Sequence, residues 1–146
     1  MRQYKEHGNV SLFDSEITLQ KLSNIGNPLE KLSSVVDFEM FRERLESKLL
    51  NNNKKNNAGA KPYDVVMMFK IIILQRYYNI SDDQTEYQIH DRTSFKDFLG
   101  LSSGDKVPDS RTICLFRERL AEKGLIFNEG QMIDASFVLA PKQRNT

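Results

Sequence analysis

Four consecutive polar or charged residues stand at the start of a predicted helix: Asp109, Ser110, Arg111 and Thr112. Asp109 or Ser110 is suited to cap this helix, since short polar side chains accept hydrogen bonds from the free amides of a first turn. Arginine and hydroxyl side chains at such a position are suited to contact base edges and phosphates in a DNA groove. We therefore predict that Ser110, Arg111 and Thr112 contact DNA, with Arg111 as the principal contact.

The apolar pattern of the same helix indicates which of its side chains face the core. The apolar positions at helical spacing are Ile113, Phe116 and Leu120. At 100° per residue, Arg111 and Glu118 share the opposite face. Arg117 and Arg119 flank the apolar positions and are predicted to reach backbone phosphates. A solvated helix held by Arg–Glu pairs fits the pattern equally well, so both interpretations stay open.

Asp134 is an acidic residue between apolar neighbours in a segment, 130–138, with the composition of a β-strand. A buried carboxylate without a partner is costly, so Asp134 either faces solvent or serves in chemistry, and the residues alone favour solvent. The histidines and the cysteine of the chain are His7, His90 and Cys114. They are too few for a typical His/Cys metal site, and one cysteine cannot form an intramolecular disulfide, which fits a reducing, cytoplasmic setting.

Composition narrows the classes of protein further. The 146 residues are 39% apolar and 28% charged, and 21 basic residues against 20 acidic ones give a formal net charge of +1. This balance excludes a uniformly basic nucleic-acid coat, so a DNA-binding surface must come from local arrangement. The longest apolar stretch, 65–74, is interrupted by Lys70 and is shorter than the roughly 20 residues that span a membrane. The N-terminus lacks the apolar core of a signal peptide, and we expect a cytoplasmic protein without a membrane partner.

Two groups of helices must position these residues. Apolar periodicity and capping residues predict helices over 14–25, 28–36 and 37–50. Residues 51–61, rich in asparagine, predict a flexible linker or long loop, where lysines could touch phosphates but solvation is the better interpretation. The second group occupies 62–124.

The second group begins with a segment that is apolar nearly all round, 65–74. Its β-branched residues also allow a strand, but the run continues through Tyr78 without a turn signal, and this length favours a helix. A helix with this pattern is buried on most sides. We expect Phe69, Ile72 and Ile73 in the core.

Shorter helices are predicted over 81–90 and 94–99, with Gly100 as the stop signal of the second. Together with the helix over 109–123, they follow the order of a helix-turn-helix unit with a lengthened turn. In that unit the last helix lies in the major groove.

Several motifs in this order resemble bacterial insertion-sequence transposases of the insertion sequence five group. The resemblance covers most of the chain from Phe13 onward. The motifs are KPYDVVMMFK at 61–70, LQRYYNISDDQ at 74–84, DRTSFKDFLGL at 91–101, PDSRTICLFRERL at 108–120, and MIDASFV at 132–138 with APKQRNT at 140–146.

The resemblance implies a DNA cut-and-join enzyme whose RNase H-like core uses Asp, Asp and Glu to hold two Mg²⁺ ions. Asp134 matches the first of these carboxylates. The sequence up to Thr146 does not contain the segments that carry the second Asp and the Glu. The family also usually has a further helical segment after the FRxRL motif, which is at 116–120 here. That segment is missing, which indicates an internal deletion. One carboxylate cannot hold two divalent ions, so we expect no Mg²⁺ cofactor and no catalysis in this chain, and Asp134 is a vestigial metal ligand.

The expected fold is therefore mainly α, a helical DNA-binding domain of helix-turn-helix type followed by a remnant β-strand of an RNase H-like catalytic domain. The leading prediction is binding of double-stranded DNA at the terminal inverted repeats of the insertion sequence. The alternatives are a helical interaction module that pairs with itself or co-assembles with intact transposase and inhibits it, and a nonfunctional pseudogene product. The predicted parts are a loose N-terminus (1–13), N-terminal helices (14–50), a polar linker (51–61), the DNA-binding domain (62–124) and the catalytic remnant (125–146).

Overall fold

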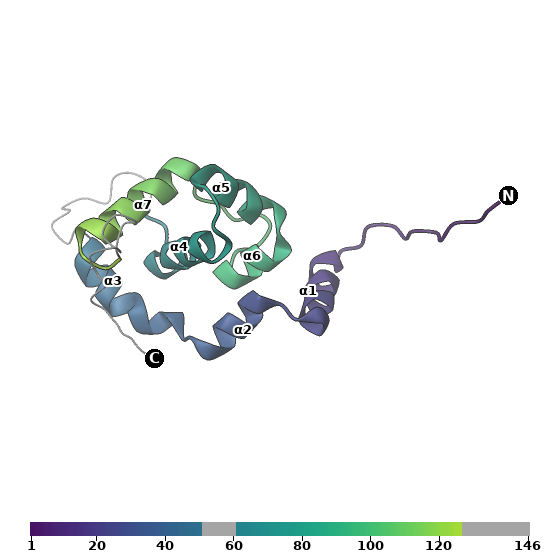
Figure 1. The fold of residues 1–146 in the computed structure, drawn as a ribbon, viewed down its shortest axis with the longest axis horizontal. Helices are drawn as coiled ribbons and strands as arrows, with labels where there is room; N and C mark the ends of the chain where they lie inside the picture. The colour runs from purple at the N-terminus through teal and green to yellow at the C-terminus, as the bar shows by residue number, and fades with distance from the viewer. Residues whose placement is uncertain (51–60, 127–146) are drawn as a thin grey trace, which may run out of the picture.

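A computed structural model describes residues 1–50 and 61–126, and these ranges are folded into α-helices joined by turns and loops (Figure 1). No strand occurs within them, which agrees with the expected mainly α class. The predicted strand around Asp134 and most of the predicted linker lie outside the described residues. None of the helices in the described ranges has both the length and the apolar character that crossing a membrane requires.

Helices α1 (Asp14–Ile25) and α2 (Pro28–Val35) follow the predicted bounds closely. Gly26 ends α1 with a left-handed φ of 99°, a conformation that costs glycine little. The Asn27 side chain then accepts a hydrogen bond from the Leu29 amide at 3.1 Å and caps α2. Both helices pack against α6, yet α1 contains no buried residue. Its predicted apolar stripe is therefore covered only in part.

The segment predicted as one helix over 37–50 forms two elements, a 3₁₀ helix η1 (Phe38–Phe41) and then α3 (Arg42–Leu49). The Asp37 carboxylate accepts a hydrogen bond from the Glu39 amide at 3.1 Å and starts the tighter helix. Phe38, Leu45 and Leu49 of these two elements are buried.

Helix α4 (Val65–Tyr78) lies in the middle of the fold, with η1, α3, α5, α6 and α7 packed around it (Figure 1). The segment is a helix rather than a strand, as its length predicted. Asp64 caps it by accepting a hydrogen bond from the Met67 amide at 3.0 Å. The Asp64 carboxylate also pairs with Arg42 at 2.6 Å, which joins the starts of α3 and α4.

The expectation for the core of α4 is confirmed at Ile72 and holds only in part at Phe69 and Ile73. Phe69 and Ile73 are half-buried, whereas Ile71, Ile72 and Leu74 are almost completely buried. Positions 69 and 73 are four residues apart and share one side of the helix. There the Phe69 ring packs against the ring of Phe41, with centroids 5.3 Å apart, at the edge of the core.

Helices α5 (Asp82–Asp91), α6 (Thr93–Leu99) and α7 (Ser110–Glu122) occur in the predicted order. Ser81 caps α5 by accepting a hydrogen bond from the Gln84 amide at 3.2 Å. Gly100 ends α6 with a φ of 77°. The three apolar positions expected to anchor α7, which are Ile113, Phe116 and Leu120, are all buried.

Candidate nucleic-acid interface

The first turn of α7 presents Arg111 to solvent, as predicted, while Ser110 and Thr112 are half-buried beside it. Asp109 caps the helix by accepting a hydrogen bond from the Thr112 amide at 2.8 Å. Hydrogen bonds from Thr112 hold the pKa of Asp109 below its ordinary value. Glu86 of α5 accepts a second bond, from the Ser110 amide at 2.7 Å.

Two amides that a helix N-terminus could otherwise offer to an anion therefore already donate hydrogen bonds to carboxylates. A phosphate near this turn would also meet the negative charges of Asp109 and Glu86. An anion at this turn would consequently have to bind side chains, and Arg111 is an exposed cation there. Leu115 and Glu118 are exposed farther along the helix, which confirms the predicted outward face.

Arg117 fastens α7 to the helices beneath it. Its guanidinium donates two hydrogen bonds to the Asp82 carboxylate, at 2.5 and 3.0 Å, and a third to the Gln75 side-chain oxygen at 2.8 Å. The contact with Arg117 lowers the pKa of Asp82 and raises that of Arg117. Paired and partly buried, Arg117 positions α7, which differs from its predicted role as a phosphate contact.

Gln75 and Thr85 complete this polar network inside the fold. Both side chains are buried. The Gln75 side-chain amide donates to Asp82 at 2.5 Å and to the Thr85 hydroxyl at 3.3 Å. Thr85 in turn donates to the Ser81 carbonyl at 2.6 Å. Because a buried polar group without a partner is costly, this network favours one arrangement of α4, α5 and α7.

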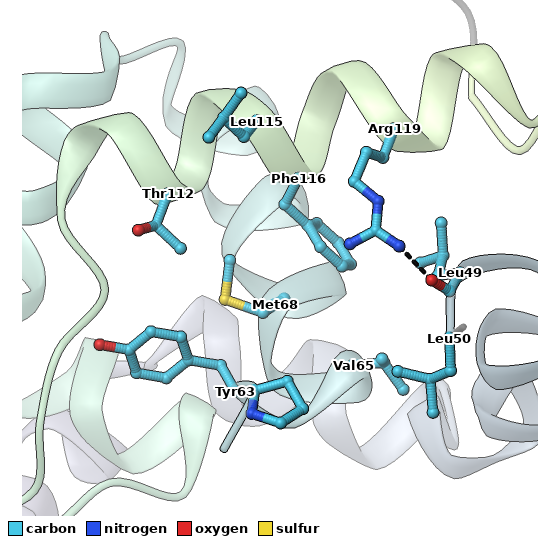
Figure 2. A pocket seen from close by; sticks show the side chains of 10 residues that line it. Leu49, Leu50, Tyr63, Val65, Met68, Thr112, Leu115, Phe116 and Arg119 are labelled. Carbon is cyan, nitrogen blue, oxygen red and sulfur yellow. Dashed lines mark hydrogen bonds between the residues drawn. The ribbon is translucent and has the colours of Figure 1, made fainter. Parts of the chain in front are cut away.

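Arg119 also contacts the protein, because its guanidinium donates a hydrogen bond to the Leu49 carbonyl at the end of α3 (Figure 2). This bond ties the C-terminal half of α7 to the N-terminal helices. Of the three arginines predicted to reach DNA, Arg117 is half-buried and paired with Asp82, whereas Arg111 and Arg119 are exposed.

An apolar groove of about 360 Å³ runs along α7 beside its exposed face (Figure 2). It lies between this helix, the end of α3 and the start of α4. Thr112 and Leu115 form part of the α7 wall, so Thr112 stands between the groove and the predicted DNA contact. The full lining comprises Leu49, Leu50, Pro62, Tyr63, Val65, Met68, Thr112, Leu115, Phe116 and Arg119.

Other predicted chemistry has no site in the described ranges. They contain no group of three or more His, Cys, Asp or Glu side chains that could hold a metal ion. Asp134 lies outside the described residues. Cys114 is a half-buried free thiol and His90 is exposed near the end of α5.

Sequence reasoning missed the groups that hold α7 in place, namely Gln75, Asp82 and Glu86. One signal was available, since Gln75 is a polar residue in a helix that is otherwise apolar nearly all round. The partners themselves are 35 residues apart for Asp82–Arg117 and 42 for Gln75–Arg117, and no spacing rule connects positions at such separations.

The Asp82–Arg117 contact predicts how stability depends on pH. The pKa of Asp82 is lowered in the folded chain relative to about 3.9 in the unfolded chain. The ionised Asp82 carboxylate therefore contributes fully to the free energy of unfolding above about pH 5. This contribution is lost as the pH falls through the lowered pKa of Asp82. We expect Asp82→Asn to unfold at less urea than the wild type at pH 7, with a difference that shrinks on acidification to about pH 2. A difference independent of pH would contradict this prediction.

A family model described as "Transposase domain (DUF772)" matches residues 17–119. The matched range begins within α1 and ends within α7, and so includes Arg111 and the Asp82–Arg117 contact. No solved structure matches the chain.

Proposed function

Because the chain belongs to the transposase domain (DUF772) family, we propose that it binds double-stranded DNA at the terminal inverted repeats of its insertion sequence. In this proposal α5, α6 and α7 act as a helix-turn-helix unit with a lengthened turn, and α7 enters the major groove. The observation that carries the proposal is the exposed Arg111 on the first turn of a helix that buried contacts hold firmly.

The residues of α7 divide into two roles in this proposal. Arg111 contacts a base edge or phosphate, and the hydroxyls of Ser110 and Thr112 support it at the backbone. Arg117 and Arg119 bind Asp82 and the Leu49 carbonyl, respectively, and so fix the angle at which α7 is presented. Rigid presentation favours specific binding, because less conformational freedom is lost when the complex forms.

The near-neutral net charge of the chain favours specific over non-specific binding to DNA. Non-specific affinity for DNA comes from neutralised phosphates and grows with their number. A chain with a net charge of +1 has little excess positive charge for that purpose. The proposal therefore relies on a small number of well-placed contacts and not on a basic surface.

Replacement of Arg111 by alanine tests the proposed contact. We expect Arg111→Ala to weaken binding to a duplex that carries the inverted repeat by about 1–3 kcal/mol, or roughly five- to 150-fold, if Arg111 reads a base. The measurement is a titration by gel shift or fluorescence anisotropy at fixed salt.

The matched control is Lys31→Ala, which removes an exposed cation from α2 and leaves α7 intact. We expect this variant to bind within about twofold of the wild type, which corresponds to roughly 0.4 kcal/mol. Equal losses in the two variants would show a general charge effect, and no loss in Arg111→Ala would remove Arg111 from the interface.

Co-assembly with a second transposase chain is a second candidate function, favoured by one observation. Helix α1 has no buried residue, and its Ile17 and Ile25 side chains are exposed. A contact with a second chain would remove these apolar side chains from water. Light scattering would show a dimer if this contact forms, and loss of the dimer in Ile17→Glu would place it on α1.

A further inference from the structure

Leu115 is a large apolar side chain on the outward face of α7. It is 47% exposed, although Phe116 next to it and Ile113 two positions earlier are buried. At 100° per residue, Leu115 points about 200° away from Ile113, which packs in the core. In Figure 2 the Phe116 ring extends from α7 toward Met68, while Leu115 stays on the outer side of the helix. Leu115 is therefore exposed because of its place in the helical period.

Two charged residues share this face with Leu115. Arg111 and Glu118 are both exposed. They lie about 40° and 60° from Leu115 around the helix axis, on the same side of it. Along α7 the outward face therefore presents a cation, then an apolar side chain, then an anion.

The order of these three residues indicates which surface of DNA the face can meet. Phosphate oxygens accept hydrogen bonds from cations, hydroxyls and amides. Leucine has nothing to donate, and the Glu118 carboxylate repels a phosphate. The edges of bases in the major groove differ, because cytosine offers an amino group and thymine a methyl group. When this face of α7 meets DNA, Leu115 and Glu118 therefore lie over base edges.

The C5-methyl group of thymine is the feature of a base edge that fits Leu115. Contact between an apolar side chain and this methyl group removes the surface of both from water. The major-groove edges of guanine and cytosine present polar groups instead. Leucine placed against those groups would take them from water without returning a hydrogen bond, which is costly. Leu115 thus favours a base pair that contains thymine.

The spacing along α7 allows Leu115 and Arg111 to reach the same stretch of groove. Four residues of an α-helix span about 6 Å along its axis. Successive bases of one DNA strand are about 3.4 Å apart. The two side chains are therefore separated by fewer than about two base pairs.

We propose that Leu115 contacts the C5-methyl group of a thymine in the major groove and makes that base pair part of the recognised sequence. This inference rests on the proposed binding of α7 to DNA. Leu115 adds an apolar contact to base edges, which neither Arg111 nor the hydroxyls of the first turn supply.

Replacement of thymine by uracil tests the contact, because uracil pairs with adenine in the same way and lacks only the methyl group. The thymines of a duplex that carries the inverted repeat are replaced one at a time. Affinity for the full chain is measured by fluorescence anisotropy at fixed salt. For the wild type we expect about fourfold weaker binding at one or two positions, the factor that corresponds to one buried methyl-sized group. At those positions we expect Leu115→Ala to bind the thymine and uracil duplexes equally well.

The matched control is Val35→Ala, which shortens an apolar side chain that is 75% exposed on α2. We expect this variant to retain the fourfold preference for thymine. Each preference is a ratio measured on one protein sample, so a smaller folded fraction in a variant lowers both affinities and leaves the ratio unchanged.

Three results would overturn the inference. Equal wild-type affinity for the uracil and thymine duplexes would do so, and the proposed function would stand if the repeat were still bound more tightly than a scrambled duplex. A fourfold preference that persists in Leu115→Ala would assign the methyl contact to another side chain. A wild-type chain that does not distinguish the repeat from the scrambled duplex would overturn the proposed function together with this inference.

Discussion

Phe95→Ala is expected to lower the free energy of unfolding by about 3–5 kcal/mol. Phe95 of α6 is fully buried. Its ring lies 5.2 Å from the Tyr78 ring of α4, and the Arg92 guanidinium lies 5.0 Å from its centroid. Truncation removes the aromatic contacts and leaves a cavity between α4 and α6. Urea denaturation followed by circular dichroism measures the change.

The matched control for this change is Phe13→Ala, because Phe13 is 67% exposed just before α1. A surface substitution of this kind is expected to change stability by about 0.5 kcal/mol or less. If Phe95→Ala were as mild as Phe13→Ala, α6 would not belong to the core, and the order of α5, α6 and α7 would lose its structural basis.

Arg117→Leu is expected to lower the free energy of unfolding by about 1.5–3 kcal/mol, the range for a lost hydrogen bond to a charged partner. The leucine keeps the apolar stem but leaves Asp82 and Gln75 without the guanidinium that both contact. Since both groups are partly or wholly buried, water replaces that contact incompletely. The measurement is a urea titration at pH 7.

Arg111→Leu provides the comparison within the same helix, since Arg111 is exposed. We expect Arg111→Leu to leave stability nearly unchanged. A variant pair in which Arg111→Leu destabilises as much as Arg117→Leu would contradict the division of α7 into an anchoring arginine and an outward-facing one.

The helix starts could be predicted because the signals for them are local. Asn27, Asp64, Ser81 and Asp109 each accept a hydrogen bond from an amide two or three residues later. Such a contact depends on a few consecutive residues and is visible in their order. The same holds for the apolar face of α7, whose period follows from helical geometry alone.

Sequence reasoning failed where contacts with residues distant in the sequence determine the burial or the role of a side chain. Phe69 has the apolar pattern of a core residue, but its exposure depends on how Phe41 and the rest of η1 approach α4. Arg117 looks like a surface cation in its own helix, and only its contact with Asp82 makes it an anchor. No periodicity in α7 distinguishes Arg117 from Arg111 in this respect.

The candidate site could be predicted in part from the sequence. The exposed position of Arg111 follows from the helical period, whereas the acidic groups around the first turn of α7 come partly from Glu86 on another helix. The apolar groove could not be foreseen, because its walls combine residues from the end of α3, the start of α4 and the middle of α7. Their apolar character suggested core, and the packing of three helices leaves them partly open.

Specific DNA recognition is the central claim, and one competition measurement tests it most directly. The wild-type chain is titrated with a labelled duplex carrying the terminal inverted repeat of its own element, at about 150 mM salt. Unlabelled repeat or a scrambled duplex of equal length and composition then competes. We expect the repeat to bind about a thousandfold or more tightly than the scrambled duplex, as is typical of specific recognition. Equal affinity for the two duplexes would contradict it.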